Sequence, residues 1–586
     1  MDQGAPFRAL EGAGIGAGLS LTAERLKEMR RSAESLLDPL GMVAPIVHAQ
    51  HAWWLHPLEF WELATRFGAD LLTLQLHTAA KLAGRDVADV VVPQSDDLRF
   101  ADPVWTREPF WDLLKQWYLF YTRHVQDALF QTPGLSPRER RRAAFWWRQC
   151  LNAAAPTNFL ATNPVAMRKA IESSGESLSR GFQIFLEDQQ AGTVRMTDPK
   201  DFTVGANLAT TAGAVVFRNR LIELIHYAPR ASAVRPTPIV LVTPWINKFY
   251  VLDLQPKKSM VRHLLDQGFD VYIVSWKNPG AEMRDTGFDD YVTEGIDPAV
   301  RIARELSGAE SVHAVGYCIG GTLLSVYMAW LSRRLPRESV PVAHWTLLAS
   351  LVDFQSPGDI EVFLDEGSVN WIADTMRTRG YLDGAEMAAT FRLLRPNPLI
   401  WHYVVQGWLY GERPPASDVL YWNMDTTRMP CRMHEHYLRE MYLKNNLVKP
   451  GALTIAGEPI ELARIHTPLY VVASEDDHIT PWRQVFRVNN WVTGPKRFVL
   501  SSSGHILGIV NPPVSPPKRR YQVGAAHRGE AADAWLAAAE QHAGTWWEDW
   551  TAWLAERCGE PRTPPPLATG AYPKLADAPG TYVLER

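Results

Sequence analysis

The sequence predicts an α/β protein in which a mostly parallel sheet with crossover helices follows a helical N-terminal domain. Hydrophobic residues recur at helical spacing up to about residue 200, and from about residue 237 short β-branched runs alternate with helical patterns. Strands that alternate with helices are typical of a parallel sheet. Since a chain of 586 residues is too long for one core, we expect a helical domain over 21–200 and a sheet domain over 201–586.

The N-terminal part carries apolar surface but no catalytic constellation. Residues 1–20 are rich in glycine and alanine without periodicity, which predicts a disordered N-terminus. The pattern then becomes helical, and Trp53, Trp54 and the stretch 60–82 give wide apolar faces. Such faces are either buried in a helical domain or lie on an apolar surface, and the sequence leaves both interpretations open.

Six short runs predict the strands of the sheet, and a long gap interrupts them. Between Val352 and about His466 no strand pattern occurs, and the sequence there is helical in pattern and rich in proline. An insertion of this length is too long for a plain crossover, so we expect a cap over the catalytic edge at about 355–450. From residue 511 we expect a loop, then one tryptophan-rich helix that contains Trp535 and Trp553, and finally a proline-rich tail. The predicted strands are 239–242, 271–274, 312–315, 345–348, 469–472 and 498–500.

Composition excludes several classes of function. The formal net charge of −4 gives no electrostatic basis for nucleic acid as a partner. The four cysteines are scattered, with no CxxC pair, which argues against a disulfide framework or a zinc site, so no metal is expected. No signal peptide and no run of about 18 apolar residues is apparent, and we expect a cytoplasmic protein without a transmembrane segment. The 23 tryptophans fit core packing and also fit an apolar partner surface.

The stretch 311–324 predicts a strand, a sharp turn and a helix, with Cys318 at the tip of the turn. Gly316 and Gly320 bracket the turn because its strand and helix backbones approach too closely for side chains. This geometry exposes the central side chain as a nucleophile at the positive end of the following helix. The alternative is a buried structural cysteine, since free cysteine is among the most buried residue types.

A nucleophile on such a turn needs an acid and a histidine that follow it in this order along the chain. Asp477 follows one predicted strand and His505 follows the next, so both lie at carboxyl ends of strands, where sites of this kind are assembled. Cys318, Asp477 and His505 therefore form the predicted triad. The acidic loop leaves alternatives open, namely His478 as the base and Glu475 or Asp476 as the acid.

The predicted triad implies a thiolate mechanism. His505 would take the proton of Cys318, a group whose free pKa is about 8.5, and Asp477 would fix the imidazole tautomer. The Ile319 amide is the expected first donor of an oxyanion hole, and the second is expected near Ile246, in the loop after the first predicted strand. Attack of a thiolate on an acyl thioester gives another thioester of nearly equal energy. A cysteine at this position therefore favours acyl transfer to an alcohol over hydrolysis.

Several motifs resemble those of polyhydroxyalkanoate synthases. The catalytic part of the resemblance lies in GYCIGG at 316–321, DHI at 477–479, GHI at 504–506 and NPP at 511–513. The resemblance runs from about residue 95 to the C-terminus. The total length and the long N-terminal domain are similar to the class I enzymes, which act without a different partner subunit. The other matching segments are 158–164, 207–211, 246–250, 252–254 and 546–550.

The resemblance implies polymerisation of (R)-3-hydroxyacyl-CoA, chiefly 3-hydroxybutyryl-CoA, with release of CoA and growth of a polyester that collects in cytoplasmic granules. It makes Cys318 the acylated nucleophile and His505 its base, while Asp477 either orients the histidine or activates the incoming hydroxyl. His478 would be a neighbouring substrate-binding group, and Arg395 is a candidate for the CoA phosphates. No cofactor is implied beyond the CoA that the substrate carries, and a homodimer is expected.

Two rival functions remain on the same scaffold. The first is a hydrolase, either a thioesterase or a polyester depolymerase, and the second is a noncatalytic granule-coating protein. The cysteine nucleophile and the long N-terminal domain argue against the hydrolase, and the intact candidate triad argues against the coat protein. The N-terminal domain is expected to bind the nascent polymer or granule surface and to stabilise the dimer.

Overall fold

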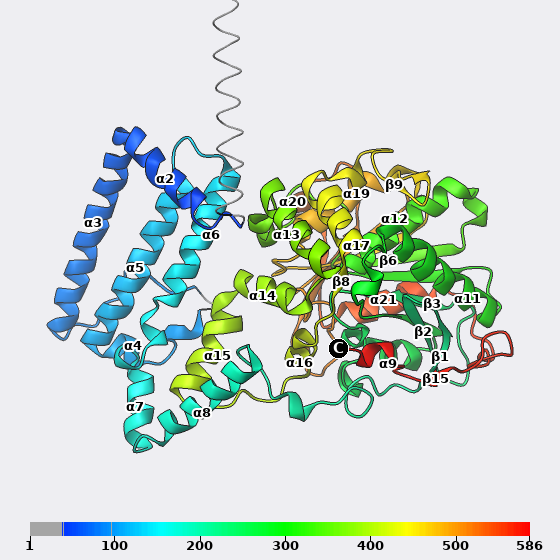
Figure 1. Cartoon of the computed structure of the whole chain (residues 1–586), viewed down its shortest axis with the longest axis horizontal. Helices are drawn as coiled ribbons and strands as arrows, with labels where there is room; N and C mark the ends of the chain where they lie inside the picture. The colour runs from blue at the N-terminus through cyan, green and yellow to red at the C-terminus, as the bar shows by residue number, and fades with distance from the viewer. Residues whose placement is uncertain (1–37, 39, 95–96) are drawn as a thin grey trace, which may run out of the picture. The chain divides into compact units, whose positions relative to one another are not determined.

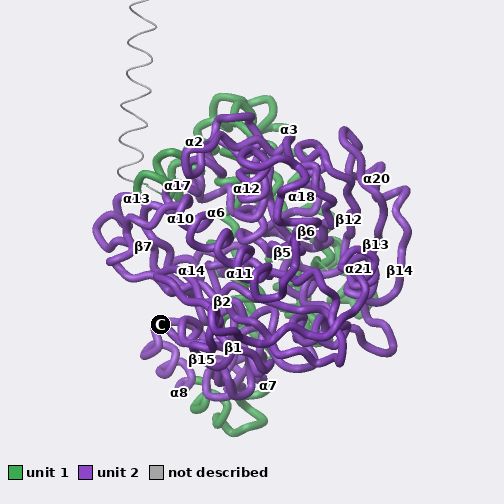
Figure 2. Tube along the Cα trace, turned by 90° about the vertical axis from the view of Figure 1, so that its right-hand side faces the viewer, with its two compact units in different colours: residues 1–181, 365–371, 396–405 green, residues 182–364, 372–395, 406–586 purple. Residues whose placement is uncertain are grey.

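The computed structural model describes residues 38, 40–94 and 97–586, and the chain divides into two compact units (Figure 2). Unit 1 comprises Met1–Gly181, Asp365–Trp371 and Pro396–Val405, and unit 2 comprises Phe182–Leu364, Ile372–Arg395 and Gln406–Arg586. The expected disordered segment at 1–20 and the expected helical residues 21–37 lie outside the described residues. The units divide after Gly181, whereas the sequence placed the boundary near residue 200, and unit 1 includes two short segments from the predicted cap.

Unit 1 is helical, as the spacing of its apolar residues predicts. Proline stands in the first turn of several helices, where its missing N–H takes no intrahelical bond away. Ser136 and Glu139 add a reciprocal capping box to the start of α6. The helices are α2 (Ala44–Leu55), α3 (Pro57–Leu82), α4 (Val104–Arg107), α5 (Pro109–Gln131), α6 (Pro137–Ala153) and α7 (Pro164–Glu172), and α8 (Glu176–Ala191) continues into unit 2.

The core of unit 1 is small and lies mainly between α3 and α5. Leu74 and Phe120 are buried there together with Trp105. A buried polar pair accompanies this core, because His77 Nε2 of α3 lies 2.7 Å from Asp112 Oδ2 of α5. The small core leaves much of the apolar surface of these helices uncovered, as described below.

All six predicted strands are present and pair in parallel within one sheet of unit 2. Their order across the sheet is β12-β11-β6-β5-β3-β4, and β3 and β6 are labelled in Figure 1. They are buried over most of their length on both faces, which explains why the sequence shows them as continuous apolar runs. The strands are β3 (Ile239–Val242), β4 (Val271–Trp276), β5 (Val312–Tyr317), β6 (Val342–Leu348), β11 (Leu469–Ser474) and β12 (Lys496–Ser501).

Antiparallel strands that the sequence did not predict extend both edges of this sheet. β2 does not appear as a continuous apolar run in the sequence, because it contains Glu223 and His226, which are both fully buried. Each has a partner: Arg218 Nε donates to Glu223 Oε1 at 2.8 Å, and His226 Nε2 lies 2.7 Å from Asp270 Oδ1. The added strands are β1 (Gly213–Arg218), β2 (Ile222–Tyr227) and β15 (Ala576–Asp577) beyond β4, and β13 (Arg520–Ala525) and β14 (Glu540–Ala543) beyond β12.

Helices cover both faces of the sheet, and each face has its own hydrophobic core. The alternation along β3 separates the two cores: Val240 and Val242 join the core of α11 and α12, whereas Ile239 and Leu241 join the core of α9 and α21. This arrangement agrees with the mostly parallel sheet with crossover helices that the sequence predicts. The four helices are α9 (Met260–Asp266), α11 (Asp297–Ser307), α12 (Ile319–Arg334) and α21 (Trp546–Ala555).

The tryptophan-rich segment near the C-terminus is not one helix, which corrects the prediction. α20 (Ala532–Ala538) contains Trp535, strand β14 follows it, and α21 begins only at Trp546. Gly544 takes a φ of 107°, and the Thr545 side chain then caps α21 by accepting the N–H of Trp547 at 3.1 Å. The tryptophans of α21 at 546, 547 and 550 are buried in the sheet core rather than presented to a partner.

The segment between β6 and β11, where the sequence predicts a cap, is mainly helical. Among the described residues, no helix is long and apolar enough to cross a membrane. The elements of this segment are α13 (Glu366–Arg379), α14 (Gly384–Leu394), α15 (His402–Val404), α16 (Asp418–Met424), α17 (Cys431–His436), and the ribbons β7 (Tyr381–Leu382) with β8 (Met429–Pro430) and β9 (Thr454–Ile455) with β10 (Glu458–Pro459). Three short helices elsewhere in unit 2 are α10 (Phe288–Asp290), α18 (Trp482–Phe486) and α19 (Val488–Trp491).

Candidate active site

Cys318 lies between the last residue of β5 and the first residue of α12, so strand, turn and helix follow one another as predicted. Its φ of 53° and ψ of −125° put a non-glycine residue in a strained backbone region. The two glycines that bracket the turn, Gly316 and Gly320, have no room for a side chain. A Cβ on Gly316 would stand 2.4 Å from the Gly321 Cα, and one on Gly320 would stand 2.4 Å from the Val242 carbonyl oxygen. The close packing of this turn therefore holds Cys318 in one backbone conformation.

Asp477 and His505 lie in the loops after β11 and β12 and contact each other. His505 Nδ1 is 2.6 Å from Asp477 Oδ2, and the Thr480 hydroxyl donates to the same oxygen at 2.6 Å. The other carboxylate oxygen accepts the N–H groups of Ile479 at 2.8 Å and Thr480 at 2.9 Å. Both oxygens of Asp477 are thus occupied, and its side chain is fully buried.

The other carboxylates of this loop lie elsewhere. Glu475 and Asp476 are exposed, and Glu475 forms an ion pair with Arg520 at 2.8 Å. Of the three carboxylates that the sequence left open, Asp477 is the one in contact with the histidine. Burial also separates the cysteines: Cys318 is half-buried, Cys431 and Cys558 are buried, and Cys150 is exposed.

The electrostatics of the His505–Asp477 pair favour a charged imidazole beside a charged carboxylate. Burial alone lowers the pKa of His505, but the charges of Asp477 and Cys318 and its hydrogen bonds with both outweigh burial and hold that pKa well above its ordinary value. Burial raises the pKa of Asp477, and His505 and Thr480 more than offset it, so that pKa lies below its ordinary range. Because Nδ1 of His505 faces Asp477, Nε2 is the ring nitrogen left for Cys318.

The two expected oxyanion-hole amides lie at neighbouring turns. Ile319 is the first residue of α12, so its N–H has no intrahelical acceptor. Ile246 lies in the loop after β3, and Gly320 packs against the end of that strand. The Thr427 hydroxyl donates to the Trp245 carbonyl oxygen. Since the C=O and N–H of one planar peptide unit point in opposite directions, this bond directs the Ile246 N–H away from Thr427.

The two expected substrate-binding residues, His478 and Arg395, lie close enough to influence each other. Burial, followed by the positive charge of Arg395, lowers the pKa of His478 to about 4. The His478 carbonyl oxygen also accepts the N–H of Asp359 at 3.4 Å, near the start of the cap segment. Near pH 7 this pair presents a neutral imidazole beside a guanidinium.

In the described part of the chain, no group of three or more His, Cys, Asp or Glu side chains is placed to hold a metal ion.

Two tyrosines without a sequence motif also lie near Cys318. Tyr437 and Tyr442 belong to the π-helical turn Tyr437–Leu443 in the cap segment, with ring centroids 5.3 Å apart. Burial raises the pKa of Tyr437 well above its ordinary value, and the charge of Cys318 contributes to the same shift. Only the folded cap brings these two tyrosines near Cys318, so no local pattern could have marked them.

Comparison with known proteins places the chain in a family. A family model described as "Poly-beta-hydroxybutyrate polymerase (PhaC) N-terminus" matches residues 96–264, and one described as "alpha/beta hydrolase fold" matches residues 237–512. The expected fold is thereby confirmed.

Three similar relatives cover most of the chain. "Poly(3-hydroxyalkanoate) polymerase" of Methylorubrum extorquens is 40% identical over 92% of this chain and 89% of its own length. "Poly(3-hydroxyalkanoate) polymerase subunit PhaC" of Rhizobium meliloti is 36% identical over 96% of this chain and 91% of its own. The protein of the same description from Cupriavidus necator is 40% identical over 83% of each chain. The chain therefore belongs to the poly(3-hydroxyalkanoate) polymerase family.

Proposed function

We propose that this chain is an acyltransferase that polymerises (R)-3-hydroxyacyl-CoA, chiefly 3-hydroxybutyryl-CoA, into polyhydroxyalkanoate with release of CoA. Family membership supports the polymerisation. The chemistry rests on one observation, the strained Cys318 at the turn together with the His505–Asp477 pair. A cysteine holds the acyl group as a thioester, which remains reactive enough to acylate a hydroxyl.

Acylation begins with transfer of the Cys318 proton to His505 Nε2. The thiolate attacks the carbonyl carbon of the substrate thioester, and the oxyanion forms beside the amides of Ile319 and Ile246. Collapse of this intermediate breaks the bond to the CoA sulfur, and the imidazolium returns a proton to the departing thiolate. The products are free CoA and an acyl group bound to Cys318, with His505 neutral again.

Chain growth uses the same groups in the same order. The terminal hydroxyl of one hydroxyacyl chain loses its proton to His505 and attacks the thioester on Cys318. An ester bond forms, and the proton on His505 returns to the Cys318 sulfur. The occupied oxygens of Asp477 support the role of orienting His505 over that of activating the hydroxyl, because Thr480 and Ile479 already fill its remaining acceptor sites.

His478 and Arg395 are proposed to bind the CoA part of the substrate. The guanidinium of Arg395 suits a phosphate, and the neutral imidazole of His478 can donate or accept a hydrogen bond without adding charge. CoA enters with the substrate and leaves as product, so the proposed reaction needs no other cofactor.

Unit 1 is proposed to bind the growing polymer and the surface of the cytoplasmic granule. Several large apolar side chains of α2 and α3 are exposed, namely Trp54, Leu55, Leu58 and Trp61. Burial within the helical domain, the other interpretation of the sequence, therefore does not account for these four side chains. An exposed apolar face of this kind suits an insoluble polyester or a second copy of the chain. A homodimer is therefore part of the proposal, and light scattering with and without a substrate analogue tests it.

One assay separates the proposed function from its rivals. Purified protein is mixed with 3-hydroxybutyryl-CoA while free thiol and turbidity are followed together. CoA release with growing turbidity is the expected result. CoA release with soluble 3-hydroxybutyrate would instead identify a hydrolase, and no CoA release would identify a noncatalytic protein.

A further inference from the structure

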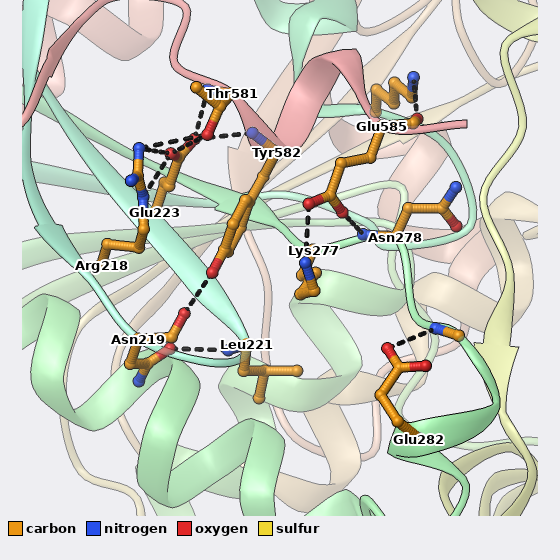
Figure 3. A network of polar contacts seen from close by, with 12 residues as sticks. Arg218, Asn219, Leu221, Glu223, Lys277, Asn278, Glu282, Thr581, Tyr582 and Glu585 are labelled. Carbon is orange, nitrogen blue, oxygen red and sulfur yellow. Dashed lines mark hydrogen bonds and ion pairs between the residues drawn. The ribbon is translucent and has the colours of Figure 1, made fainter.

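The last residues of the chain bind the sheet through a buried carboxylate (Figure 3). Glu223 on β2 is fully buried, yet it accepts the N–H of Thr581 at 2.9 Å, the N–H of Tyr582 at 3.0 Å and the Thr581 hydroxyl at 2.8 Å. The Tyr582 hydroxyl donates to the Asn219 carbonyl oxygen at 2.6 Å. Because a buried carboxylate that loses its partners is strongly disfavoured, these bonds fix the C-terminal segment 581–586 in place.

Beyond this anchor, Glu585 joins the loops that follow two neighbouring parallel strands. Its carboxylate accepts from Lys277 Nζ at 2.7 Å and from the Asn278 N–H at 3.3 Å, directly after β4. Its backbone carbonyl oxygen accepts from Lys248 Nζ at 2.9 Å, in the loop after β3. Lys277 Nζ also lies 4.6 Å from the ring centroid of Tyr582. One residue near the chain end therefore binds both loops.

Lys248 connects the C-terminal segment to the cap. Its side chain is 5% exposed, and its Nζ lies 2.9 Å from Asp425 Oδ1. Its carbonyl oxygen accepts from Trp422 Nε1 at 2.7 Å, and the Tyr250 hydroxyl donates to Asp425 Oδ2 at 2.8 Å. A buried ammonium is disfavoured without such partners, so the loop 243–250 cannot shift without breaking several of these bonds.

Ile246, the proposed second oxyanion donor, lies two residues before Lys248. On one side Thr427 of the cap holds this part of the loop, because its N–H donates to the Ile246 carbonyl oxygen at 3.2 Å and its hydroxyl holds the preceding carbonyl. On the other side stands Lys248 and, through it, Glu585. An oxyanion hole works only when its N–H groups are aimed at the developing charge, so a shift of about 1 Å here is expected to slow acylation.

We propose that Glu585 is a positioning residue. Its backbone carbonyl holds the loop 243–248 through Lys248, and its carboxylate holds the loop after β4 through Lys277 and Asn278, so that the Ile246 amide faces the oxyanion formed during acylation of Cys318. The inference rests on the proposed function. Its distinctive consequence is that the thiolate of Cys318 and its reactivity toward a simple alkylating agent do not depend on Glu585.

The test measures two rates on Glu585→Ala, on a chain truncated after Leu584 and on wild type. The first is acylation by 3-hydroxybutyryl-CoA, from the burst of free CoA in rapid mixing. The second is alkylation of Cys318 by iodoacetamide, which needs a thiolate but no oxyanion hole. Glu585→Ala removes the carboxylate contacts with Lys277 and Asn278 but keeps the backbone carbonyl that binds Lys248, whereas the truncation removes both. We therefore expect Glu585→Ala to lower kcat and the acylation rate about 10-fold with KM changed less than about twofold, and the truncation to lower them about 100-fold. Alkylation is expected to stay at the wild-type rate.

Two further variants sharpen the comparison. Lys574→Met breaks an exposed ion pair with Asp577 (2.6 Å) shortly before the C-terminal segment, and we expect wild-type rates. Glu585→Gln keeps an acceptor for Lys277 and is expected to recover most of the acylation rate. Equal loss of both rates in Glu585→Ala would overturn the inference, because general loosening of the fold would slow alkylation as well as acylation. An unchanged acylation rate in Glu585→Ala would also overturn it. Failure of the wild type itself to release CoA would instead refute the proposed function.

Discussion

The two units differ in how far their large apolar side chains are buried. In unit 2 the parallel strands are buried on both faces, and even large rings such as Trp546 and Trp550 are 0% exposed. In unit 1 the side chains of Trp54 and Leu58 are 82% exposed, and that of Trp61 is 68% exposed. The unit that carries the strained cysteine is closely packed, and the unit without a candidate catalytic group leaves several large apolar side chains uncovered.

Under the proposed function, this difference separates two requirements, because reactivity and contact with an insoluble product need different kinds of structure. A residue held at a positive φ persists only where the surrounding packing over-determines it, which the sheet and its two cores provide. Contact with a polyester needs apolar side chains that remain available, and such side chains do not belong beside a desolvated ion pair. Substitutions in the two units should therefore have effects of different kinds.

The largest expected effect is that of Cys318→Ala in unit 2. Removing the sulfur removes the proposed acceptor of the acyl group, so the rate of CoA release is expected to fall at least about 10³-fold. Cys150→Ala and Cys431→Ala are the matched controls, since neither lies on a strand–turn–helix, and both should stay within about twofold of wild type. Thiol titration with 3-hydroxybutyryl-CoA measures this, and near-wild-type CoA release by Cys318→Ala would contradict the proposed role of the cysteine.

Asp477→Asn is expected to have the next largest effect. The amide keeps the shape but removes the charge that holds the pKa of His505 high and fixes its tautomer, so kcat should fall about 10²-fold or more. Glu475→Gln in the same loop is the control, because Glu475 is exposed and pairs with Arg520. Equal activity of Asp477→Asn and Glu475→Gln would remove Asp477 from the site.

A smaller effect concerns stability against acid in unit 2. His434 of α17 is buried, and desolvation lowers its pKa to about 4, below the value of about 6.5 in the unfolded chain. The unfolded state therefore binds the proton more tightly, so the stability present above pH 6.5 is lost as the pH falls toward 4. From pH 7 to pH 5 the free energy of unfolding should fall about 2 kcal/mol more in wild type than in His434→Gln. Denaturant titration at the two pH values checks this, and identical pH dependence would show that His434 stays solvated.

The smallest expected effect is in unit 1. Replacing Trp54 and Trp61 together by serine removes exposed apolar area without opening a cavity, so stability should change little. We expect the share of protein that sediments with polyhydroxybutyrate granules to fall several-fold and the lag before rapid polymerisation to lengthen, while the first acylation of Cys318 keeps its rate. Unchanged sedimentation and lag would mean that these faces serve another purpose.

Patterns in the sequence were enough for the parallel part of the sheet and for the turn at Cys318. The six strands are buried on both faces and so read as apolar runs, and the glycines at 316 and 320 mark the close approach of strand and helix. Strand β2 could not be found in the same way, because it carries Glu223 and His226, which are buried with the help of partners from distant segments. The single C-terminal helix was a wrong prediction, since Gly544 and the cap at Thr545 divide it.

Spacing alone could not choose among the three acidic residues of one loop, and it gave no sign of the contacts of Tyr437 or Glu585. These depend on long-range folding that brings the cap and the chain end against the carboxyl edge of the sheet. Local patterns thus locate a candidate nucleophile, whereas the groups proposed to orient and support it are identified only from the tertiary structure.

The most direct measurement of the central claim is the mass of the peptide that contains Cys318 after brief reaction with 3-hydroxybutyryl-CoA. Wild-type protein is quenched in acid within the burst phase, digested and compared with Cys318→Ala treated in the same way. Acylation through a thioester predicts one or more 3-hydroxybutyryl units on this peptide, labile to hydroxylamine, with at least one CoA released for each modified chain. Release of CoA while the Cys318 peptide stays unmodified, or an acyl group found on another residue, would contradict it.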